Sequence, residues 1–320
     1  MTKQPPTLND LPPAPAGRSG WPWTESTPAL PPTLPDGTAW PAISIVTPNY
    51  NYAHFLEETI RSVLLQGYPN LQYIVIDDGS QDDSVAVIQR YEPWLHFWIS
   101  RPNCGQSCSI NEGFTHASGY ILGWLNSDDV FYPGALAEVG RQLAGRVRTM
   151  LVGAATLTDG PHTLTGRDDR RQPAWEEMAY DGRTVPQPST LWTADLWPPA
   201  GPLDTSLRYT MDYDLWLRMV PQAQEVRYSS QLLACERIHE NQMSLAAARA
   251  GQYEPVNCEK AYAALHAARG RGESPARWLL KSYRRRWRMA RHLGKYRVLW
   301  TSGFHRVALR AAFAPNYRLW

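Results

Sequence analysis

The chain has 320 residues, 43% of them hydrophobic, and a formal net charge of +2. This length and apolar content are enough to bury a large core, which excludes a wholly disordered chain and predicts a globular protein. Neither an apolar run of about 18 residues nor a signal-peptide pattern is present, so we expect a cytoplasmic protein.

The first forty residues are rich in proline, with eleven prolines by Pro41 and no hydrophobic period. Proline removes backbone donors and disfavours regular elements. We therefore predict that residues 1–40 form a mostly disordered tail, in which Trp21, Trp23 and Trp40 could hold parts of it on the folded body.

From Ala42 onward, short apolar runs alternate with helical patterns. The predicted elements are a strand at 43–46 ended by Pro48, a helix in 53–66, a strand at 73–76, a helix capped by Asp82 or Asp83, a strand in 95–100, and a helix followed by a strand in 109–129. This alternation predicts a mostly parallel sheet with helices on both faces. Ligands of such sheets lie beyond the carboxyl ends of the strands.

The four cysteines are Cys104, Cys108, Cys235 and Cys258. They do not form the paired Cys-x-x-Cys motifs of a zinc site. Since thiols stay free in a reducing compartment, we expect all four to be unpaired.

Five segments resemble glycosyltransferase family 2, in the same order: SIVTPNYN, IVIDDGSQDDS, NEGFTHASGYILGWLNSDDVFYPGAL, QPSTLW and MDYDLWLR. The resemblance runs from about Ser44 to Ser244 and implies a GT-A fold, a Rossmann-like sheet flanked by helices. It places a catalytic domain at 41–245, with a nucleotide-sugar half at about 41–135 and an acceptor half at about 136–245. Residues 246–320 then form a helical, basic extension.

The segment NSDD puts two adjacent carboxylates at the end of the fourth predicted strand. The diphosphate of a nucleotide sugar is negatively charged, and a divalent cation is its usual partner. The resemblance implies that Asp128 binds Mn²⁺ or Mg²⁺, while Asn126 replaces the family's first acid and hydrogen-bonds ribose or sugar. Metal binding then rests partly on Asp129, for which the alternative is capping the helix that follows.

The first two strand ends are predicted to hold the nucleotide. By resemblance, Pro48, Asn49 and Tyr50 line the base pocket, with the tyrosine ring stacked on the base, and Asp78 accepts a hydrogen bond from base or ribose. The alternative for Tyr50 is packing under the following helix. Asn111 also matches a position near the donor.

The second half is predicted to hold the acceptor. Asp212 falls on the family's catalytic acid and would take the proton of the acceptor hydroxyl as general base. Met211 stands where many relatives have Glu, so help from that acid is missing. The alternative for Asp212 is a favourable contact with the dipole of the helix it begins.

Other acceptor-half residues are assigned by the same resemblance. We expect Gln187, Ser189 and Trp192 to line the acceptor side and Trp216 to offer an aromatic platform for a sugar. His239 in RIHENQMS is expected to contact metal or phosphate, and so is Arg237 nearby.

Residues 271–320 hold thirteen Lys or Arg and one acid, a net charge of +12, while the other 270 residues sum to −10. Within this segment the basic residues Lys281, Arg284 and Arg288 recur beside an apolar stripe that includes Leu280, Tyr283 and Trp287. This spacing predicts an amphipathic helix that binds an anionic membrane surface. A packing helix and a nucleic-acid site are the alternatives, and we do not expect nucleic acid.

The function predicted from these observations is a metal-dependent, inverting glycosyltransferase that builds a bacterial surface polysaccharide. Its donor would be a UDP-sugar and its acceptor a glycan or lipid-linked hydroxyl, with the enzyme located in the cytoplasm or on the inner face of the membrane. The alternative is a glycan- or nucleotide-binding protein that lost turnover, which Asn126 and Met211 would permit.

Overall fold

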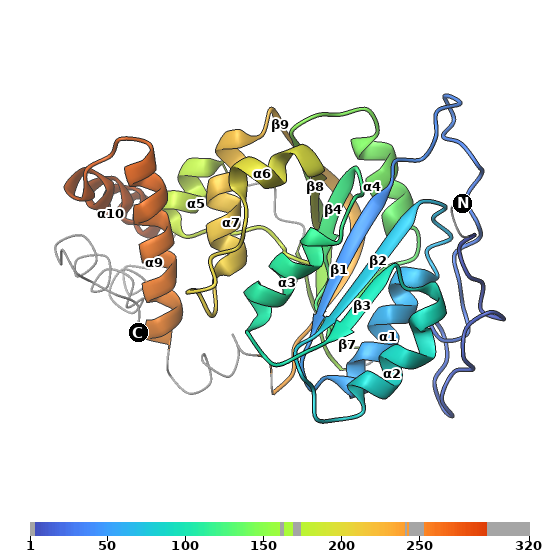
Figure 1. Ribbon diagram of the computed structural model, residues 1–320. Helices are drawn as coiled ribbons and strands as arrows, with labels where there is room; N and C mark the ends of the chain where they lie inside the picture. Colours follow the sequence, from blue (N-terminus) through green and yellow to red (C-terminus); the bar gives the residue numbers. More distant parts are fainter. Residues whose placement is uncertain (1–3, 161–162, 169–173, 241, 243–252, 293–320) are drawn as a thin grey trace. The chain divides into compact units, whose positions relative to one another are not determined.

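A computed structural model describes residues 4–160, 163–168, 174–240, 242 and 253–292 (Figure 1). The chain divides into two compact units. The first unit comprises Met1–Arg170, Pro186–Pro199 and Ala223–Ile238, and the second comprises Arg171–Val185, Ala200–Gln222 and His239–Trp320. Among the helices of the described residues, none is both long and apolar enough to cross a bilayer.

The first unit contains the sheet. Its strands are β1 (Ile43–Asn49), β2 (Leu71–Asp77), β3 (Phe97–Ser100), β4 (Ile121–Trp124), β5 (Val130–Phe131), β6 (Thr149–Gly160), β7 (Thr163–Asp168), β8 (Thr190–Thr193) and β9 (Glu225–Arg237). Its helices are α1 (Ala53–Leu64), α2 (Ser84–Tyr91), α3 (Gln106–Thr115) and α4 (Ala135–Leu143), with 3-10 turns η1 (Glu92–Trp94) and η2 (Ala194–Leu196).

The strand order among the described residues is β3-β2-β1-β4-β8-β6-β9-β5, with β7 paired to β6. Strands β1 to β4 are parallel to one another, whereas β8 is antiparallel to both β4 and β6. The predicted fold class, a mostly parallel sheet flanked by helices, is confirmed.

Pro48 does not end the first strand, contrary to the sequence-based prediction. Strand β1 continues to Asn49, which is paired with Asp77 of β2. Pairing with β4 on the other side stops at Val46 and Trp124. The amide of Asp78 bonds the carbonyl of Asn49, so the backbone groups of Asn49 point toward β2. Because these groups alternate along a strand, those of Pro48 point toward the β4 side. The missing N–H of Pro48 therefore removes no sheet hydrogen bond.

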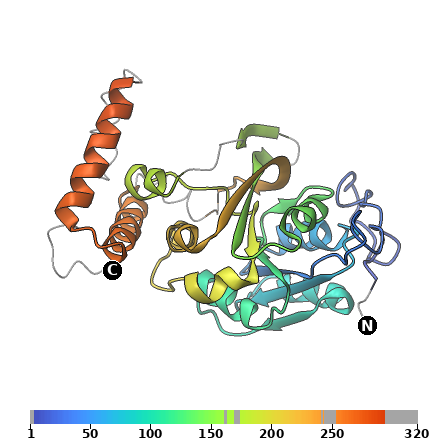
Figure 2. The same cartoon turned by 90° about the horizontal axis from the view of Figure 1, so that it is seen from above.

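Helices cover both faces of the sheet (Figures 1 and 2). Side chains of β1 alternate between the faces, and Ile43 and Ile45 join a core cluster with residues of α1, α2 and α4. Val46 points to the opposite face, where α3 approaches so closely that a Cβ on Gly113 would lie 2.4 Å from its Cγ1. Only glycine permits this approach.

Residues 4–40 are packed against other parts of the first unit, which corrects the prediction of a mostly disordered tail. Trp23 and Trp40 are buried, as is Leu11. The amides of Thr27 and Leu30 donate to carbonyls at the end of α1 and in the turn after it, at 3.0 Å each. The tail is thus an ordered strap without regular elements.

Arg61 of α1 explains how a proline-rich segment is held. Its side chain is 1% exposed and donates to the carbonyls of Pro12 at 2.8 Å, Pro22 at 3.0 Å and Trp23 at 3.1 Å. Its guanidinium also lies 5.4 Å from the Trp23 ring centre. Proline-rich chain keeps its carbonyl acceptors, and one buried cation binds several of them.

The second unit is helical in its described part. Its elements are α5 (Trp175–Asp181), α7 (Met211–Met219), η3 (Val220–Gln222), α9 (Tyr253–Gly270) and α10 (Pro275–His292). The short α6 (Trp197–Ala200) begins in a segment of the first unit and ends in one of the second. Helix α7 is buried along most of its length, and Trp175 of α5 donates its indole N–H to the Leu217 carbonyl at 3.0 Å. Helix α10 packs on α5 through Trp278, which donates to the Ala179 carbonyl at 3.1 Å.

Candidate active site

The ends of β1 and β2 form a hydrogen-bonded pair. The buried Asp77 carboxylate accepts from the Asn49 amide at 2.8 Å and from the hydroxyls of Ser80 and Ser100 at 2.6 Å each. Within the described residues, the buried Oδ1 of Asn49 has no hydrogen-bond partner. Asp77 therefore supports the turn, and Asn49 presents an available acceptor at the strand end.

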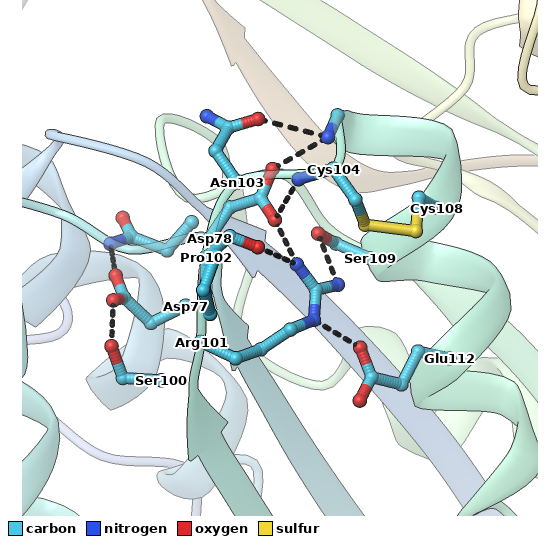
Figure 3. A network of polar contacts seen from close by, with 12 residues as sticks. Asp77, Asp78, Ser100, Arg101, Pro102, Asn103, Cys104, Cys108, Ser109 and Glu112 are labelled. Atoms are coloured by element: carbon cyan, nitrogen blue, oxygen red, sulfur yellow. Dashed lines mark hydrogen bonds and ion pairs between the residues drawn. A yellow bond between two sulfur atoms is a disulfide. The ribbon is translucent and has the colours of Figure 1, made fainter.

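Asp78, the next residue, is held by a different network (Figure 3). Its carboxylate forms an ion pair with Arg101 and accepts from the backbone amides of Cys104 at 3.0 Å and Gly105 at 2.9 Å. Arg101 also bonds Glu112 of α3 at 2.6 Å. The carboxylate is thus oriented by the loop between β3 and α3, and its Oδ2, with one of these bonds, can accept another.

Cys104 and Cys108 form a disulfide within this loop and the first turn of α3 (Figure 3). This corrects the prediction of free thiols for these two residues. Their four-residue separation brings the side chains together because α3 begins between them. Cys235 is free, and the side chain of Cys258 lies outside the described residues.

The other residues predicted to bind the nucleotide differ in their exposure to solvent. Tyr50 is 46% exposed, so its ring is not packed under the helix and is available for stacking. Asn51 follows with a φ of 57°, a left-handed turn that Asn tolerates. Pro48 is buried in β1, and Asn111 is half-buried in α3.

The acid pair lies beyond the end of β4. Asp128 is 8% exposed and Asp129 is 3% exposed. Asp129 does not cap α4, whose N-terminus at Gly134 has no side-chain cap, so the capping alternative is excluded. Its carboxylate instead accepts from the Arg237 backbone amide at 3.1 Å. Burial, then the negative charges of Asp128 and Glu236, raise the pKa of Asp129 well above its usual range.

Arg237, which the resemblance assigned to metal or phosphate, lies beside the pair, whereas Tyr52 was missed. The Arg237 side chain, 13% exposed, lies 3.1 Å from Glu58 and 5.0 Å from the Phe55 ring centre, and its charge opposes the rise in the Asp129 pKa. Burial and the charges of the acid pair raise the pKa of Tyr52 to about 12. Pairing of β5 with β9 brings Arg237 here, which no local pattern reveals.

A divalent cation fits the acid pair. In the described parts of the chain, no group of three or more His, Cys, Asp or Glu side chains is placed to hold a metal. Magnesium and manganese commonly use one or two carboxylates and take phosphate oxygens and water for the rest. The two carboxylates are adjacent in the chain and both are buried, so a bound cation would balance their negative charge.

Asn126, predicted to contact the donor, is hydrogen-bonded to Gln187, which was predicted to line the acceptor side. Its Oδ1 accepts from Gln106 at 2.8 Å and its Nδ2 donates to Gln187 at 3.0 Å. Gln187 in turn donates to the Trp124 carbonyl at 2.9 Å. The structure therefore brings Gln187, predicted from the acceptor half, next to Asn126 at the end of β4.

Ser189, Trp192 and Trp216 require correction, since all three side chains are completely buried. Ser189 donates to the Gly153 carbonyl at 2.8 Å and ties β8 to β6. Trp192 packs with its ring centre 5.8 Å from that of Trp124. Trp216 lies on the buried side of α7. These residues build the core and present no surface to an acceptor.

Asp212 lies in the first turn of α7 in the second unit, and its side chain is partly exposed. Its Oδ1 accepts from the Tyr213 amide at 2.7 Å. Loss of contact with water raises the pKa of this carboxyl, while the Tyr213 amide and then Lys260 lower it. His239 belongs to the same unit and is half-buried; its metal role stays a prediction.

Sequence comparisons connect this arrangement to a family. The model of glycosyl transferase family 2 matches residues 44–189. An uncharacterized glycosyltransferase of Rickettsia typhi is 28% identical over 224 residues, covering 65% of this chain and 68% of the relative. One of Mycobacterium tuberculosis is 38% identical over 111 residues, covering 34% of this chain and 42% of the relative.

Solved structures share the fold. TarS of S. aureus (residues 1–349), in complex with UDP, has a TM-score of 0.54 and 15% identity, covering 71% of this chain and 65% of that chain. The mannosyltransferase PcManGT of Pyrobaculum calidifontis, with GDP-Man and Mn²⁺, has a TM-score of 0.52 and 18% identity, covering 91% of both chains. Residues 44–189 thus match glycosyl transferase family 2, the similar relatives are glycosyltransferases, and TarS shares the fold.

Proposed function

We propose that the chain is an inverting, divalent-metal-dependent glycosyltransferase. It moves a sugar from a nucleotide diphosphate sugar, a UDP-sugar first, to a hydroxyl of a glycan or lipid-linked acceptor in surface polysaccharide synthesis. The observation that carries the proposal is the buried acid pair Asp128 and Asp129 at the end of β4, with Arg237 beside it. Proteins of the same fold bind UDP-GlcNAc in one case and GDP-Man with Mn²⁺ in another.

The donor would be bound along the strand ends of the first unit. Tyr50 stacks on the base, and Asn49 and Asp78 accept hydrogen bonds from base or ribose. Asn126, anchored by Gln106 and Gln187, orients the ribose or the sugar. Asn111 lies near the donor on α3.

Asp128 and Asp129 would hold Mn²⁺ or Mg²⁺, with His239 as a further proposed contact. The bound cation supplies charge stabilisation for the leaving diphosphate. Arg237 adds a positive charge that does not depend on metal.

Transfer would proceed as one displacement with Asp212 as base. The acceptor oxygen forms a bond to the anomeric carbon while its proton passes to the Asp212 carboxylate. The bond from that carbon to the phosphate oxygen breaks, and its electron pair stays on the diphosphate. Because attack comes opposite the leaving group, the configuration inverts. The raised pKa of Asp212 makes its carboxylate a stronger proton acceptor.

Peripheral binding to an anionic membrane is a second part of the proposal. In α10, Leu280 and Tyr283 are 48% and 52% exposed, so these two members of the predicted apolar stripe do not serve core packing. Trp278 and Ser282 instead hold α10 on α5. The side chain of Trp287 lies outside the described residues. The +12 charge of residues 271–320 would attract anionic lipid.

A donor screen tests the enzyme proposal. UDP-glucose, UDP-GlcNAc, dTDP-glucose and GDP-mannose are each incubated with the protein, with Mn²⁺ or with EDTA, and released nucleotide is measured. We expect hydrolysis or transfer of one donor that requires Mn²⁺ and is lost in Asp128→Asn. The control Asp83→Asn changes an exposed carboxylate at the start of α2 and should keep full activity. Stabilisation by nucleotides without turnover of any donor would favour the inactive binding protein.

A further inference from the structure

Helix α9 contributes a buried carboxylate to the start of α7. Glu259 is 7% exposed. Its carboxylate accepts from three consecutive backbone amides, those of Arg208 at 2.9 Å, Tyr209 at 2.7 Å and Thr210 at 3.1 Å. The Thr210 hydroxyl donates to the same group at 3.2 Å. A single side chain from α9 thus binds the three residues that lead into Met211 and Asp212.

This contact fixes the segment that leads into the helix. Thr210 is the N-cap residue of α7 and its own side chain makes no cap hydrogen bond. Glu259 is the acceptor for the amide of this N-cap residue and for those of the two residues before it. Its negative charge lies next to the helix N-terminus, where the dipole favours it.

The family motif has an acid immediately before the catalytic one, and here that position is Met211. Met211 cannot accept a hydrogen bond in this way. We propose that Glu259 supplies the missing carboxylate and acts as a positioning residue. It fixes the start of α7 and thereby the direction of the Asp212 carboxylate. The inference rests on the proposed function, since it presumes that Asp212 is the base.

Electrostatics support the assignment. Lys260, the next residue of α9, lies 5.5 Å from the Tyr213 ring centre. Glu259 raises and Lys260 lowers the pKa of Asp212, beside the larger effects of burial and of the Tyr213 amide. Asp214, two residues on, is paired with Arg218 at 2.8 Å. Helix α5, also packed on α7, contributes the Met178 carbonyl, which accepts from the Tyr213 hydroxyl at 2.6 Å.

Two variants separate positioning of Asp212 from mere stabilisation of the segment before α7. Glu259→Gln keeps the size of the side chain but removes the charge, and its one carbonyl oxygen cannot accept as many amides. Lys260→Met leaves every bond of Glu259 intact and removes only the opposing charge. Glu273→Gln is the matched control, because Glu273 is another carboxylate of the same unit, bound to Tyr180 at 2.8 Å.

The test is titration of the Asp212 carboxyl by ¹³C NMR in the full chain, with the signal assigned from its absence in Asp212→Asn. This readout requires no donor. We expect the midpoint to fall in Glu259→Gln and to rise in Lys260→Met, with no change in Glu273→Gln. With the donor found in the screen, Glu259→Gln should lower kcat by about 10- to 100-fold, the loss caused by a misplaced group, with KM for donor nearly unchanged.

The outcomes distinguish the two proposals. Unmoved midpoints in both variants, or normal kcat in Glu259→Gln while Asp212→Asn is inactive, would overturn the positioning role alone. If Asp212→Asn itself transfers normally, the assignment of Asp212 as base is wrong, and the proposed mechanism fails independently of Glu259. A Glu259→Gln protein with a lower Tm but unchanged titration and kcat would show that Glu259 only stabilises the segment before α7.

Discussion

Replacing Asp129 by Asn should stabilise the metal-free protein and weaken its response to manganese. The buried carboxylate faces the charges of Asp128 and Glu236 and is balanced in part by Arg237. Asparagine keeps an acceptor for the Arg237 amide, now 3.1 Å from Oδ1, and removes one negative charge. Relief of a strained functional group typically adds about 0.5–2 kcal/mol to the free energy of unfolding.

In the presence of manganese, the wild-type protein should become the more stable of the two. At a concentration 100 times the dissociation constant, a ligand adds about 2.7 kcal/mol to the stability of a protein that binds it only when folded. That corresponds to a rise in Tm of about 4 °C for a chain of this size. The wild-type protein should gain this amount, and Asp129→Asn clearly less.

The dependence on pH follows from the sign of the shift. A carboxyl whose folded pKa is raised binds its proton more tightly in the folded state, so its favourable contribution is complete below the unfolded pKa and is lost as pH rises through the folded one. The advantage of Asp129→Asn should therefore be present at pH 7.5 and vanish toward pH 4. Thermal unfolding in EDTA and in MnCl₂ measures both effects, with Asp83→Asn as control. A variant that is less stable than wild type in EDTA, or that gains as much from Mn²⁺, would refute this reasoning.

Three further predictions concern other parts of the molecule. Gly105→Ala places a side chain at a φ of 94°, at a cost of about 1–3 kcal/mol. It should weaken donor binding measured by calorimetry, because the Gly105 amide orients Asp78. Unchanged affinity would show that Asp78 does not bind the donor. Arg61→Met should lower the free energy of unfolding by about 3 kcal/mol or more, since hydrogen bonds from a charged donor contribute about 1.5–3 kcal/mol each, and should expose residues 4–40 to limited proteolysis; a protected tail would contradict this. The double change of Leu280 and Tyr283 to Ser should reduce sedimentation with anionic vesicles without lowering Tm, while equal vesicle binding would leave α10 as a packing helix.

The order of strands and helices was predictable because each depends on neighbouring residues. The apolar run of β2 and the helix after it were located from the sequence, and Asp82, one of the two predicted caps, accepts from the Ser84 amide at 3.0 Å. Pro48 was misjudged because the effect of proline depends on which side of a strand is paired. That information belongs to the sheet, not to the segment.

Contacts between distant segments could not be predicted. The proline-rich tail contains no signal that Arg61 would bind its carbonyls. Trp192 was assigned to the acceptor by resemblance and Trp216 because aromatic rings bind sugars. The same rings fill cores, and only packing decides between these roles. Glu259 lies far along the chain from the motif it completes, so its role appears only when α9 is seen beside the start of α7.

Asp212→Asn gives the most direct test of the catalytic proposal. The change keeps the shape of the side chain but prevents it from taking a proton. With the donor identified by the screen and Mn²⁺ present, wild type and variant are compared for donor affinity by calorimetry and for sugar transfer at saturating donor. We predict equal affinity and a decrease in transfer by a factor on the order of 10²–10⁴. Transfer by Asp212→Asn at close to the wild-type rate would contradict the assignment of Asp212 as the base.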